Sequence, residues 1–272
     1  MKERGYMEPQ IIHNSVPKAE ETDVRIVSWN ILSEELTPTA PNIHARISDI
    51  CKTIRTLDPD AMGVQEISET CYQLFREMLP EYEFTNPKTQ AGEFSYTGVA
   101  YRADRYRLLD SGIENYEQGN RRIRIVNWIA VEPVRNGKRF LLVSTHWDRH
   151  ACNRPAQAKY MGHLVAGLSE KFGIPAICTG DFNTRENTDI FQNFLEISGQ
   201  KDAKDLAPEV VNRCFSGHPV GSFVPEFDEP FSIDHLTVAD GIRVLQYEQV
   251  INETVARASD HFPTCADLKF PN

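Results

Sequence analysis

The chain has 272 residues, of which 40% are hydrophobic and 25% are charged. This composition is typical of a globular domain with a packed core and excludes global disorder. The formal net charge of −10 at pH 7 repels a polyanion over most of the surface and disfavours tight nonspecific binding to long DNA. A local basic rim can still bind a short nucleic acid or a small phosphorylated ligand.

No segment has the apolar length of a signal peptide or a membrane span, so we expect a cytoplasmic protein without a membrane segment. The six cysteines are Cys51, Cys71, Cys152, Cys178, Cys214 and Cys265. They are scattered and form no C-x-x-C pair, which predicts reduced thiols and provides no spacing for a zinc site.

Residues 1–23 are polar and contain proline, which predicts a flexible leader, and residues 24–272 are predicted to form a single domain. In the first part of this domain, short apolar runs predict strands over 24–32 and 60–67. Apolar residues spaced by three and four predict a helix from Ile43 to Leu57, and a second amphipathic helix is expected over 69–79.

Between residues 82 and 145 the pattern changes to extended segments, and the Asn136-Gly137 pair predicts a hairpin between the last two. Further on, helices are expected over 154–171 and 188–197, strands over 174–183, 231–238, 242–251 and 262–270, and a Gly- and Pro-rich loop over 216–230. Because strands and helices are interleaved and hairpins are frequent, we predict an α/β (α+β) fold of mixed sheets covered by helices.

Polar side chains with metal or proton chemistry lie at the ends of six predicted strands. They are Asn30, Glu66, His146, Asp181 with Asn183, Asp234 with His235, and Asp260 with His261. Functional groups of sheet proteins gather at strand ends, and magnesium prefers hard oxygen ligands such as carboxylates and amides. The pattern therefore predicts a divalent-metal site for phosphate chemistry.

Each residue alone also has an ordinary structural explanation. Asn30 fits a turn, Glu66 a surface charge, and His146 a core imidazole, while Asp181 and Asn183 fit an Asx turn. The joint occurrence favours function. For His235 a supporting role is expected. The remaining histidines, His13, His44, His163 and His218, are interpreted as ordinary surface or loop residues.

These motifs occur in the order and approximate spacing of a known family. They read Trp29-Asn30, Gln65-Glu66, Thr145-His146-Trp147-Asp148, Gly180-Asp181-Phe182-Asn183, Ile233-Asp234 and Ser259-Asp260-His261. On them, residues 24–268 resemble the endonuclease/exonuclease/phosphatase family, and segments 92–112 and 124–128 are similar to a bacterial branch of it. The resemblance implies a deoxyribonuclease I-like four-layer sandwich of two packed mixed β-sheets flanked by helices.

The resemblance also implies a role for each site residue. Glu66 resembles the principal ligand of Mg²⁺ or Mn²⁺, with Asn30 and Asp260 helping to hold the ion or its waters. Asp181 resembles the group that orients and deprotonates the attacking water, and Asn183 a donor to a phosphate oxygen.

His261, oriented by Asp234, resembles the imidazole that binds the scissile phosphate, and His146 a second phosphate-stabilising or acid group. Arg124 and Arg154 are candidates for contacting a phosphate or a carboxylate of the site, although Arg154 fits a helix-start charge equally well. Asp148 is expected to support other site residues.

The sequence thus predicts a metal-dependent phosphoesterase that directs water at a phosphomonoester or phosphodiester, with a small soluble substrate favoured. One alternative is a nuclease on the same site, for which the only basic cluster, residues 120–124, is weak support. Another is a catalytically silent binding domain, but such a domain should have lost one of the central site residues, and none is lost. The substrate's leaving group, the metal preference and the oligomeric state stay open, and no partner protein is indicated.

Overall fold

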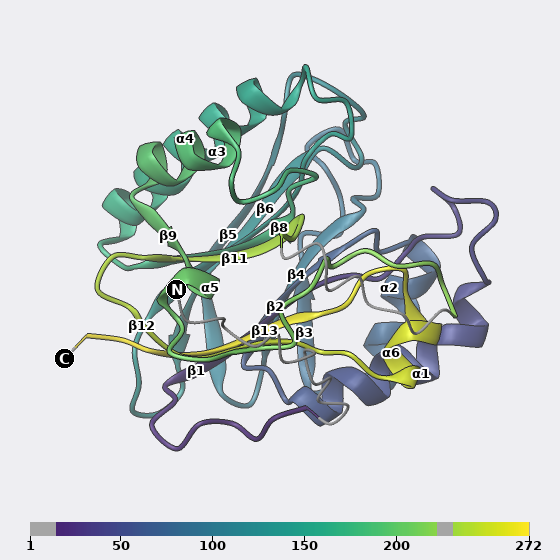
Figure 1. Cartoon of the computed structure of the whole chain (residues 1–272), viewed down its shortest axis with the longest axis horizontal. Helices are drawn as coiled ribbons and strands as arrows, with labels where there is room; N and C mark the ends of the chain where they lie inside the picture. The colour runs from purple at the N-terminus through teal and green to yellow at the C-terminus, as the bar shows by residue number, and fades with distance from the viewer. Residues whose placement is uncertain (1–14, 222–230, 272) are drawn as a thin grey trace, which may run out of the picture.

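Two mixed β-sheets pack face to face, and helices cover the outer face of each (Figure 1). The computed structural model describes residues 15–221 and 231–271, and the elements below are counted within them. The resulting order of layers, helix, sheet, sheet and helix, confirms the predicted four-layer fold class.

The first sheet has seven strands among the described residues, in the spatial order β10-β12-β13-β1-β2-β4-β3. Their bounds are β1 Val24–Asn30, β2 Ala61–Gln65, β3 Tyr82–Thr85, β4 Thr97–Arg102, β10 Val210–Val211, β12 Arg243–Gln249 and β13 Thr264–Lys269. Strand β1 runs parallel to β2 and antiparallel to β13. The central strand therefore ends beside the end of β2 and the beginning of β13.

The second sheet has six strands within the same part of the chain, in the order β5-β6-β7-β8-β11-β9. Their bounds are β5 Tyr106–Asn115, β6 Ile125–Pro133, β7 Phe140–His146, β8 Ala176–Asp181, β9 Gln200–Asp202 and β11 Asp234–Ala239. The antiparallel pairing of β6 with β7 confirms the hairpin predicted around Asn136-Gly137. Strands β7 and β8 are parallel, whereas β8 and β11 are antiparallel.

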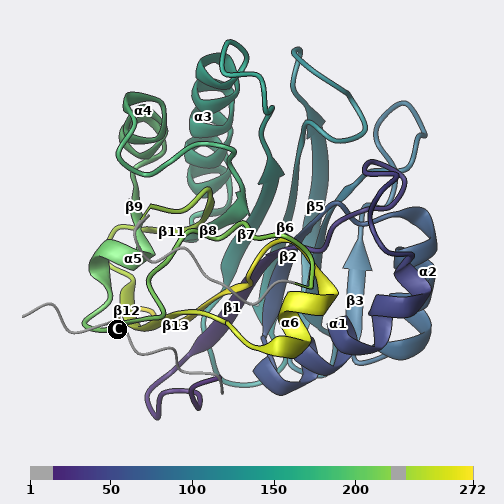
Figure 2. The same cartoon turned by 45° about the vertical axis from the view of Figure 1, so that its right-hand side comes forward.

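Helices lie on opposite sides of the paired sheets, as the turned view shows (Figure 2). The first sheet is covered by α1 Ile43–Leu57, α2 Glu69–Met78 and α6 Glu253–Ala258, and the second by α3 Arg154–Phe172 and α4 Asp189–Ser198. Four of these helices match predicted ones. Helix α6 and the four-residue α5 (Ala203–Leu206) were not predicted, because so few residues carry no readable helical period.

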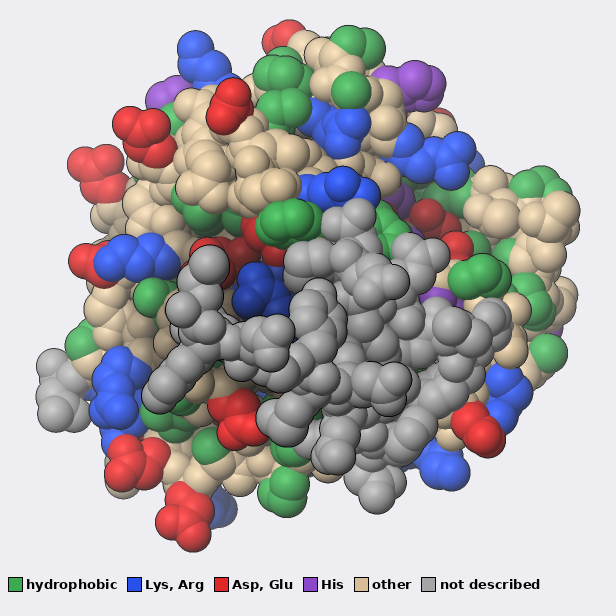
Figure 3. All heavy atoms as spheres, in the orientation of Figure 1, with side chains coloured by type: hydrophobic (Ala, Val, Ile, Leu, Met, Phe, Trp, Pro, Cys, Tyr) green, Lys and Arg blue, Asp and Glu red, His purple; other side chains and the backbone are tan. Residues whose placement is uncertain are grey.

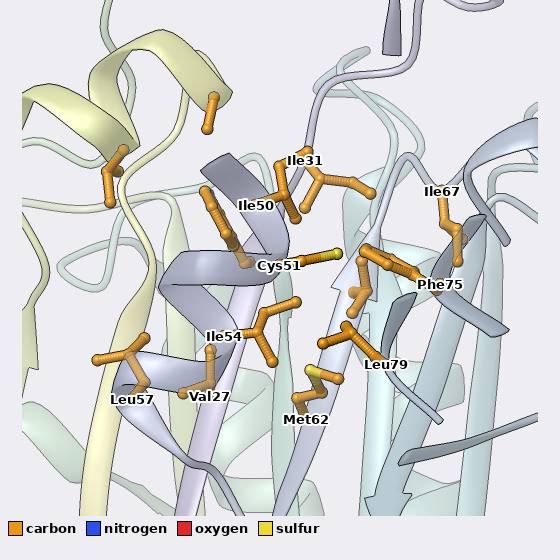
Figure 4. Close-up of a cluster of buried hydrophobic side chains, with 14 of the residues drawn as sticks. Val27, Ile31, Ile50, Cys51, Ile54, Leu57, Met62, Ile67, Phe75 and Leu79 are labelled. Carbon is orange, nitrogen blue, oxygen red and sulfur yellow. The ribbon is translucent and has the colours of Figure 1, made fainter. Parts of the chain in front are cut away.

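The outer core of the first sheet is built by the apolar stripe that predicted α1. Ile50, Ile54 and Leu57 point from α1 toward Val27 of β1 and Met62 of β2 (Figure 4). Asn42 caps the start of this helix by accepting a hydrogen bond from the backbone N–H of His44. Burial of such side chains contributes roughly 1.5–3 kcal/mol each, so the stripe fixes α1 against the sheet.

The layer between the two sheets changes character along the strands. On β1 the residues facing the second sheet read Val24, Ile26, Ser28 and Asn30, and on β7 the facing row reads Phe140, Leu142, Ser144 and His146. Alternate residues of a strand share a face. Each row therefore begins with apolar side chains that fill the inter-sheet core and ends in polar side chains at one common end of the sandwich.

Two predicted segments lie partly outside the described residues. Of the predicted leader, only residues 15–23 are described, and they contact the first sheet: Ala19 donates its backbone N–H to Asp267, and Lys18 pairs with Asp60 at 2.6 Å. Of the predicted loop 216–230, the described part, 216–221, contains no helix or strand, and 222–230 lie outside. Among the described residues, none of the helices has the length and apolar composition needed to cross a bilayer.

Candidate active site

The polar ends of the inter-sheet rows meet because the strand pairings put them at one end of the sandwich. His146 at the end of β7 is level with Asp181 at the end of β8, which in turn is level with Asp234 at the start of β11. In the first sheet, Asn30 ends β1, and Glu66 follows β2 directly. Residues far apart in the sequence are thus brought into one cluster.

Asp181 lies at the centre of this cluster. Its carboxylate is 3.3 Å from Nε2 of His146 and accepts hydrogen bonds from Nδ2 of Asn30 at 3.2 Å and from the backbone N–H of Asn183 at 2.8 Å. Burial raises the pKa of Asp181, but the imidazoles of His146 and His261 and the hydrogen bonds to its carboxylate hold that pKa well below its usual range. Asp181 is therefore ionised at neutral pH.

His261 and Asp234 form a buried pair beside Asp181. Nδ1 of His261 is 2.7 Å from Oδ2 of Asp234, and Asp181, Asp234 and His261 each offer a polar atom within 4.8 Å of the others. Burial lowers the pKa of His261, but the carboxylates of Asp234, Asp181 and Asp260 raise it well above its usual range. The pair thus keeps an imidazolium at neutral pH, with Nε2 turned away from Asp234.

The three residues predicted to hold the metal or its waters lie around the end of β1. Glu66 has a left-handed backbone, φ +59°, and its Oε1 is 3.4 Å from Nδ2 of Asn30. Oδ1 of Asp260 is buried without a hydrogen-bond partner among the described residues. Burial raises the pKa of Asp260, and the nearby Glu66 carboxylate raises it further, although His261 opposes the shift. A divalent cation would offset this crowding of negative charge, so the donor set fits a hard metal ion.

The Asp181–Asp234–His261 group also has the make-up of a metal site. However, the Nδ1 atom of His261 is already engaged by Asp234. That pairing makes Glu66 and Asp260 the better ligands for an oxygen-seeking cation.

Two residues that belong to the quoted motifs but were given no role, Trp29 and Ser259, anchor the Asp260-His261 segment to β1. Ser259 donates its hydroxyl to the backbone oxygen of Asn30 at 2.6 Å, and Trp29 donates its indole N–H to the backbone oxygen of His261 at 2.8 Å. Both flank predicted site residues in the sequence, and that proximity was the available signal.

Arg46 of α1, which sequence reasoning did not single out, is a third anchoring residue, and it is buried. Its guanidinium donates to the backbone oxygens of Ile31, Leu32 and Ala258 at 2.6–2.7 Å. It thereby ties the chain after Asn30 to the chain before Ser259. An arginine within the apolar stripe of a helix is the signal that marks it.

The three outer residues of the predicted site separate into different environments. Arg124 and Asp148 line a cleft of about 590 Å³ that also reaches Glu66 and His146. Arg154, the first residue of α3, instead donates to the backbone oxygen of Asn183 and so supports the Asp181–Asn183 turn.

Asp148 organises one wall of this cleft. It accepts hydrogen bonds from the backbone and ring of His150 and from the side chain of Asn153, while its own N–H donates to Gln157. Burial raises the pKa of Asp148, but these hydrogen bonds and nearby Arg124 lower it to about 2. Asp148 is a structural anion that fixes the turn between β7 and α3.

The other histidines follow the predictions with one difference. His235 is buried, donates from Nε2 to the backbone oxygen of Thr184 at 2.8 Å and packs on Phe191, so it supports the fold, and burial lowers its pKa to about 3. His44 and His163 are exposed. His218 lies in a loop but is buried, because its ring stacks on Phe262 at 4.0 Å. His13 lies outside the described residues.

Two packed mixed sheets flanked by helices, with carboxylates, amides and imidazoles collected at one end of the sandwich, define the deoxyribonuclease I-like class of proteins. The model of the Endonuclease/Exonuclease/phosphatase family matches residues 27–261, and the chain belongs to this family. Members of the family are hydrolases that act on phosphoester bonds.

Solved structures agree over nearly the whole chain. An endonuclease/exonuclease/phosphatase from Bacteroides vulgatus is 26% identical, with 92% of this chain and 100% of that chain covered and a TM-score of 0.76. A mannosyl-6-phosphatase of Bacteroides thetaiotaomicron is 20% identical, with 91% and 100% covered and a TM-score of 0.76. The human Nocturnin catalytic domain with bound sulfate is 18% identical, with 94% and 97% covered and a TM-score of 0.72. No protein with a curated description matches the chain by sequence.

Proposed function

We propose that the protein is a Mg²⁺- or Mn²⁺-dependent phosphoesterase that hydrolyses a small phosphomonoester or phosphodiester. The observation that carries the proposal is the buried Asp181 carboxylate, which lies between His146 and the Asp234–His261 pair, with the Asn30, Glu66 and Asp260 donors alongside. A held water, positive charge toward phosphate oxygens and hard donors for a cation are the parts that phosphoester hydrolysis needs.

The chain's own residues divide this work. Asp181 is ionised and accepts a hydrogen bond from the attacking water, which it orients and deprotonates. His261 is kept protonated by Asp234 and donates from Nε2 to a phosphate oxygen, where negative charge accumulates in the transition state. His146 faces the cleft and stabilises the phosphate or the leaving oxygen. Asn183 donates one hydrogen of its Nδ2 to the backbone oxygen of Trp147 at 2.9 Å and the other to a phosphate oxygen.

Glu66, Asp260 and Asn30 would hold the divalent ion, which supplies Lewis acidity and neutralises charge on the phosphate when bound. Of the three, Asn30 is held in place most directly, since its Oδ1 accepts from the backbone N–H of Leu32 and its Nδ2 reaches Asp181. Its amide therefore links the metal donors to the base.

A small substrate is favoured over a long nucleic acid. The net charge is −10, and on the coloured part of the face in Figure 3 a local group of basic side chains lies at the upper right, while the other basic side chains are scattered among acidic ones. Because the same fold carries a mannosyl-6-phosphatase, sugar phosphates belong first among the candidate substrates. The experiment below also tests the alternative that the protein is a nuclease.

The experiment is a substrate screen of purified protein stripped of metal with EDTA and then supplied with Mg²⁺ or Mn²⁺. We expect hydrolysis of sugar phosphates or of bis-p-nitrophenyl phosphate that disappears with EDTA and returns with the ion. Abasic DNA and poly(A) test the nuclease reading. If calorimetry shows that the metal binds but no phosphoester is hydrolysed, the proposal fails and a silent binding domain replaces it.

A further inference from the structure

The cleft beside the reaction centre contains positive charge that the proposed chemistry does not use. It is walled by three loops, around residues 35–37, 119–124 and 146–153. The second loop is part of the basic cluster at 120–124, in a chain with 39 acidic and 29 basic residues. The volume of the cleft, about 590 Å³, falls within the range of small-molecule sites, roughly 300–1,000 Å³.

Arg124 is the buried member of this positive group, at 8% exposure. Its Nη1 donates to the backbone oxygen of Trp147 at 2.7 Å, and its Nε forms a long ion pair with Asp148 at 4.0 Å, which is beyond hydrogen-bond distance. A guanidinium has five N–H donors. Among the described residues only one atom of this group is hydrogen-bonded, so the remaining donors are available to a ligand in the cleft.

Arg149, on the neighbouring loop, is exposed and lines the same cleft. It has no hydrogen-bond or ion-pair partner in ranges 15–221 and 231–271, although the closest acid in sequence, Asp148, lies next to it. The lone pairs of Asp148 are taken by His150 and Asn153 instead. Asp148 therefore forms no ion pair with Arg149, and the positive charge of Arg149 faces the cleft.

Gly119 permits this wall to form. It has a left-handed φ of +88°, and a Cβ at this position would lie 2.5 Å from Oδ2 of Asp148 and 2.8 Å from Cγ of Arg124. Only glycine allows the loop to approach so closely. The loop at Gly119 is thus packed directly against Arg124 and against Asp148, the residue before Arg149.

We propose that Arg124 and Arg149 form a second anion subsite, which binds a phosphate on the leaving-group side of the substrate while the first phosphate reacts between His146 and His261. The inference rests on the proposed function and narrows its substrate class to molecules with two phosphate groups. Planar guanidinium groups bind phosphate oxygens in pairs, which suits them to this task.

The lining of the cleft indicates the part of the substrate between the two phosphates. Among the described residues, those that line it include Glu35, Thr37, Asn120 and Asn153, and the only aromatic rings are the imidazoles of His146 and His150. Nucleobases are commonly held by stacking on aromatic rings. Hydroxyl groups instead suit carboxylate and amide partners, so the subsite fits a phosphorylated polyol, a sugar bisphosphate, better than a nucleotide.

The test compares kcat/KM for glucose 1,6-bisphosphate with kcat/KM for glucose 6-phosphate and glucose 1-phosphate. The wild type should prefer the bisphosphate at least tenfold, since a charge-assisted contact to a phosphate contributes roughly a tenfold to hundredfold gain. In Arg149→Gln this preference should fall about tenfold, and Arg149→Lys should restore part of it. The matched control is Arg135→Gln, an exposed arginine on the β6–β7 connection, which should keep the wild-type ratio.

A nucleic-acid arm compares a 5′-phosphorylated thymidine dinucleotide with its unphosphorylated form. An Arg149-dependent preference seen only there would retain the anion subsite but overturn the sugar bisphosphate. A wild-type ratio near one in both arms, or an Arg149→Gln ratio equal to that of the wild type, overturns the subsite itself.

A binding readout separates this inference from the proposed function. In the Asp181→Asn background, calorimetry should show glucose 1,6-bisphosphate binding at least tenfold more tightly than glucose 6-phosphate, and adding Arg149→Gln should remove the difference. Equal affinities would refute the subsite whether or not the enzyme turns over. Tight binding of the bisphosphate without hydrolysis in the wild type would refute only the proposed function.

Discussion

The two ends of the inter-sheet layer are made by the same strands but differ in what they contribute. At the end remote from the site, Ile26, Leu142 and Ile177 are fully buried among apolar neighbours. At the other end, four residues further along β7 and β8, the same two rows end in His146 and Asp181. One end thus supplies burial energy and the other supplies chemistry.

The difference shows why such a site can exist inside a buried layer. Buried polar groups are costly unless they are hydrogen-bonded, and at this end Nδ1 of His146, Oδ1 of Asp234 and Oδ1 of Asp260 have no partner within the described residues. The apolar end must offset that cost. Substitutions at the two ends should therefore separate stability from activity.

The largest expected effect is on activity at the polar end. Asp181→Asn and His261→Ala should each lower kcat about 10²- to 10⁴-fold, the usual contribution of a positioned base or acid. Asp181→Asn should lower stability only modestly, because it keeps the side-chain volume, whereas His261→Ala should lower it clearly, because Asp234 loses its partner in a buried pair. Steady-state kinetics and urea unfolding of each purified variant test both parts. Near-normal activity in either variant would falsify its assigned role.

At the apolar end the order of effects should reverse. Leu142→Ala should lower the free energy of unfolding by about 2–5 kcal/mol, as large-to-small core substitutions do, while kcat per folded molecule stays near that of the wild type. The matched variant is Ser144→Ala, one step along the same row, which loses one hydrogen bond from Nε2 of Gln65 and should cost about 1 kcal/mol. Equal losses of stability in the two variants would contradict the division of the layer.

The polar end could be predicted from sequence because its signal is local. A short apolar run followed by Asn30 or Asp181 predicts both a strand and a side chain at its end, and each such signal needs only a few residues. The structure brings these residues together through strand pairing. Because the motifs occur in the order and spacing of a known family, the sequence was sufficient to predict that these residues lie together in one site.

The division of the layer could not be predicted in the same way. The run Val24–Asn30 is buried throughout, because its other face packs on α1, so no hydrophobic alternation reveals which residues face the second sheet. The position of Arg46 in the apolar stripe of α1 marks it as buried, but the identity of its partner cannot be predicted in this way, since Ala258 is 212 residues away. Contacts of that range depend on the assembled fold, and a single sequence carries no local trace of them.

An effect on stability smaller than that of Leu142→Ala is expected where the two ends meet, at Gly63 in the middle of β2. Here the sheets approach so closely that a Cβ would lie 2.0 Å from Oγ1 of Thr179 and 2.8 Å from Oγ of Ser144. Gly63 has no left-handed backbone, so Gly63→Ala tests sterics alone, and overpacking should cost about 1–2 kcal/mol.

Because β2 carries Glu66 just beyond its end, the same displacement should also lower kcat/KM, so Gly63→Ala is expected to affect both stability and activity from a position outside the site. The double variant Gly63→Ala/Thr179→Ala removes the nearest clash. It should regain stability relative to the sum of the single changes, as a double-mutant cycle by urea unfolding would measure. If the stability losses of the two single variants simply add in the double variant, the two sheets can separate locally around Gly63. The apolar end then does not hold the polar end in place.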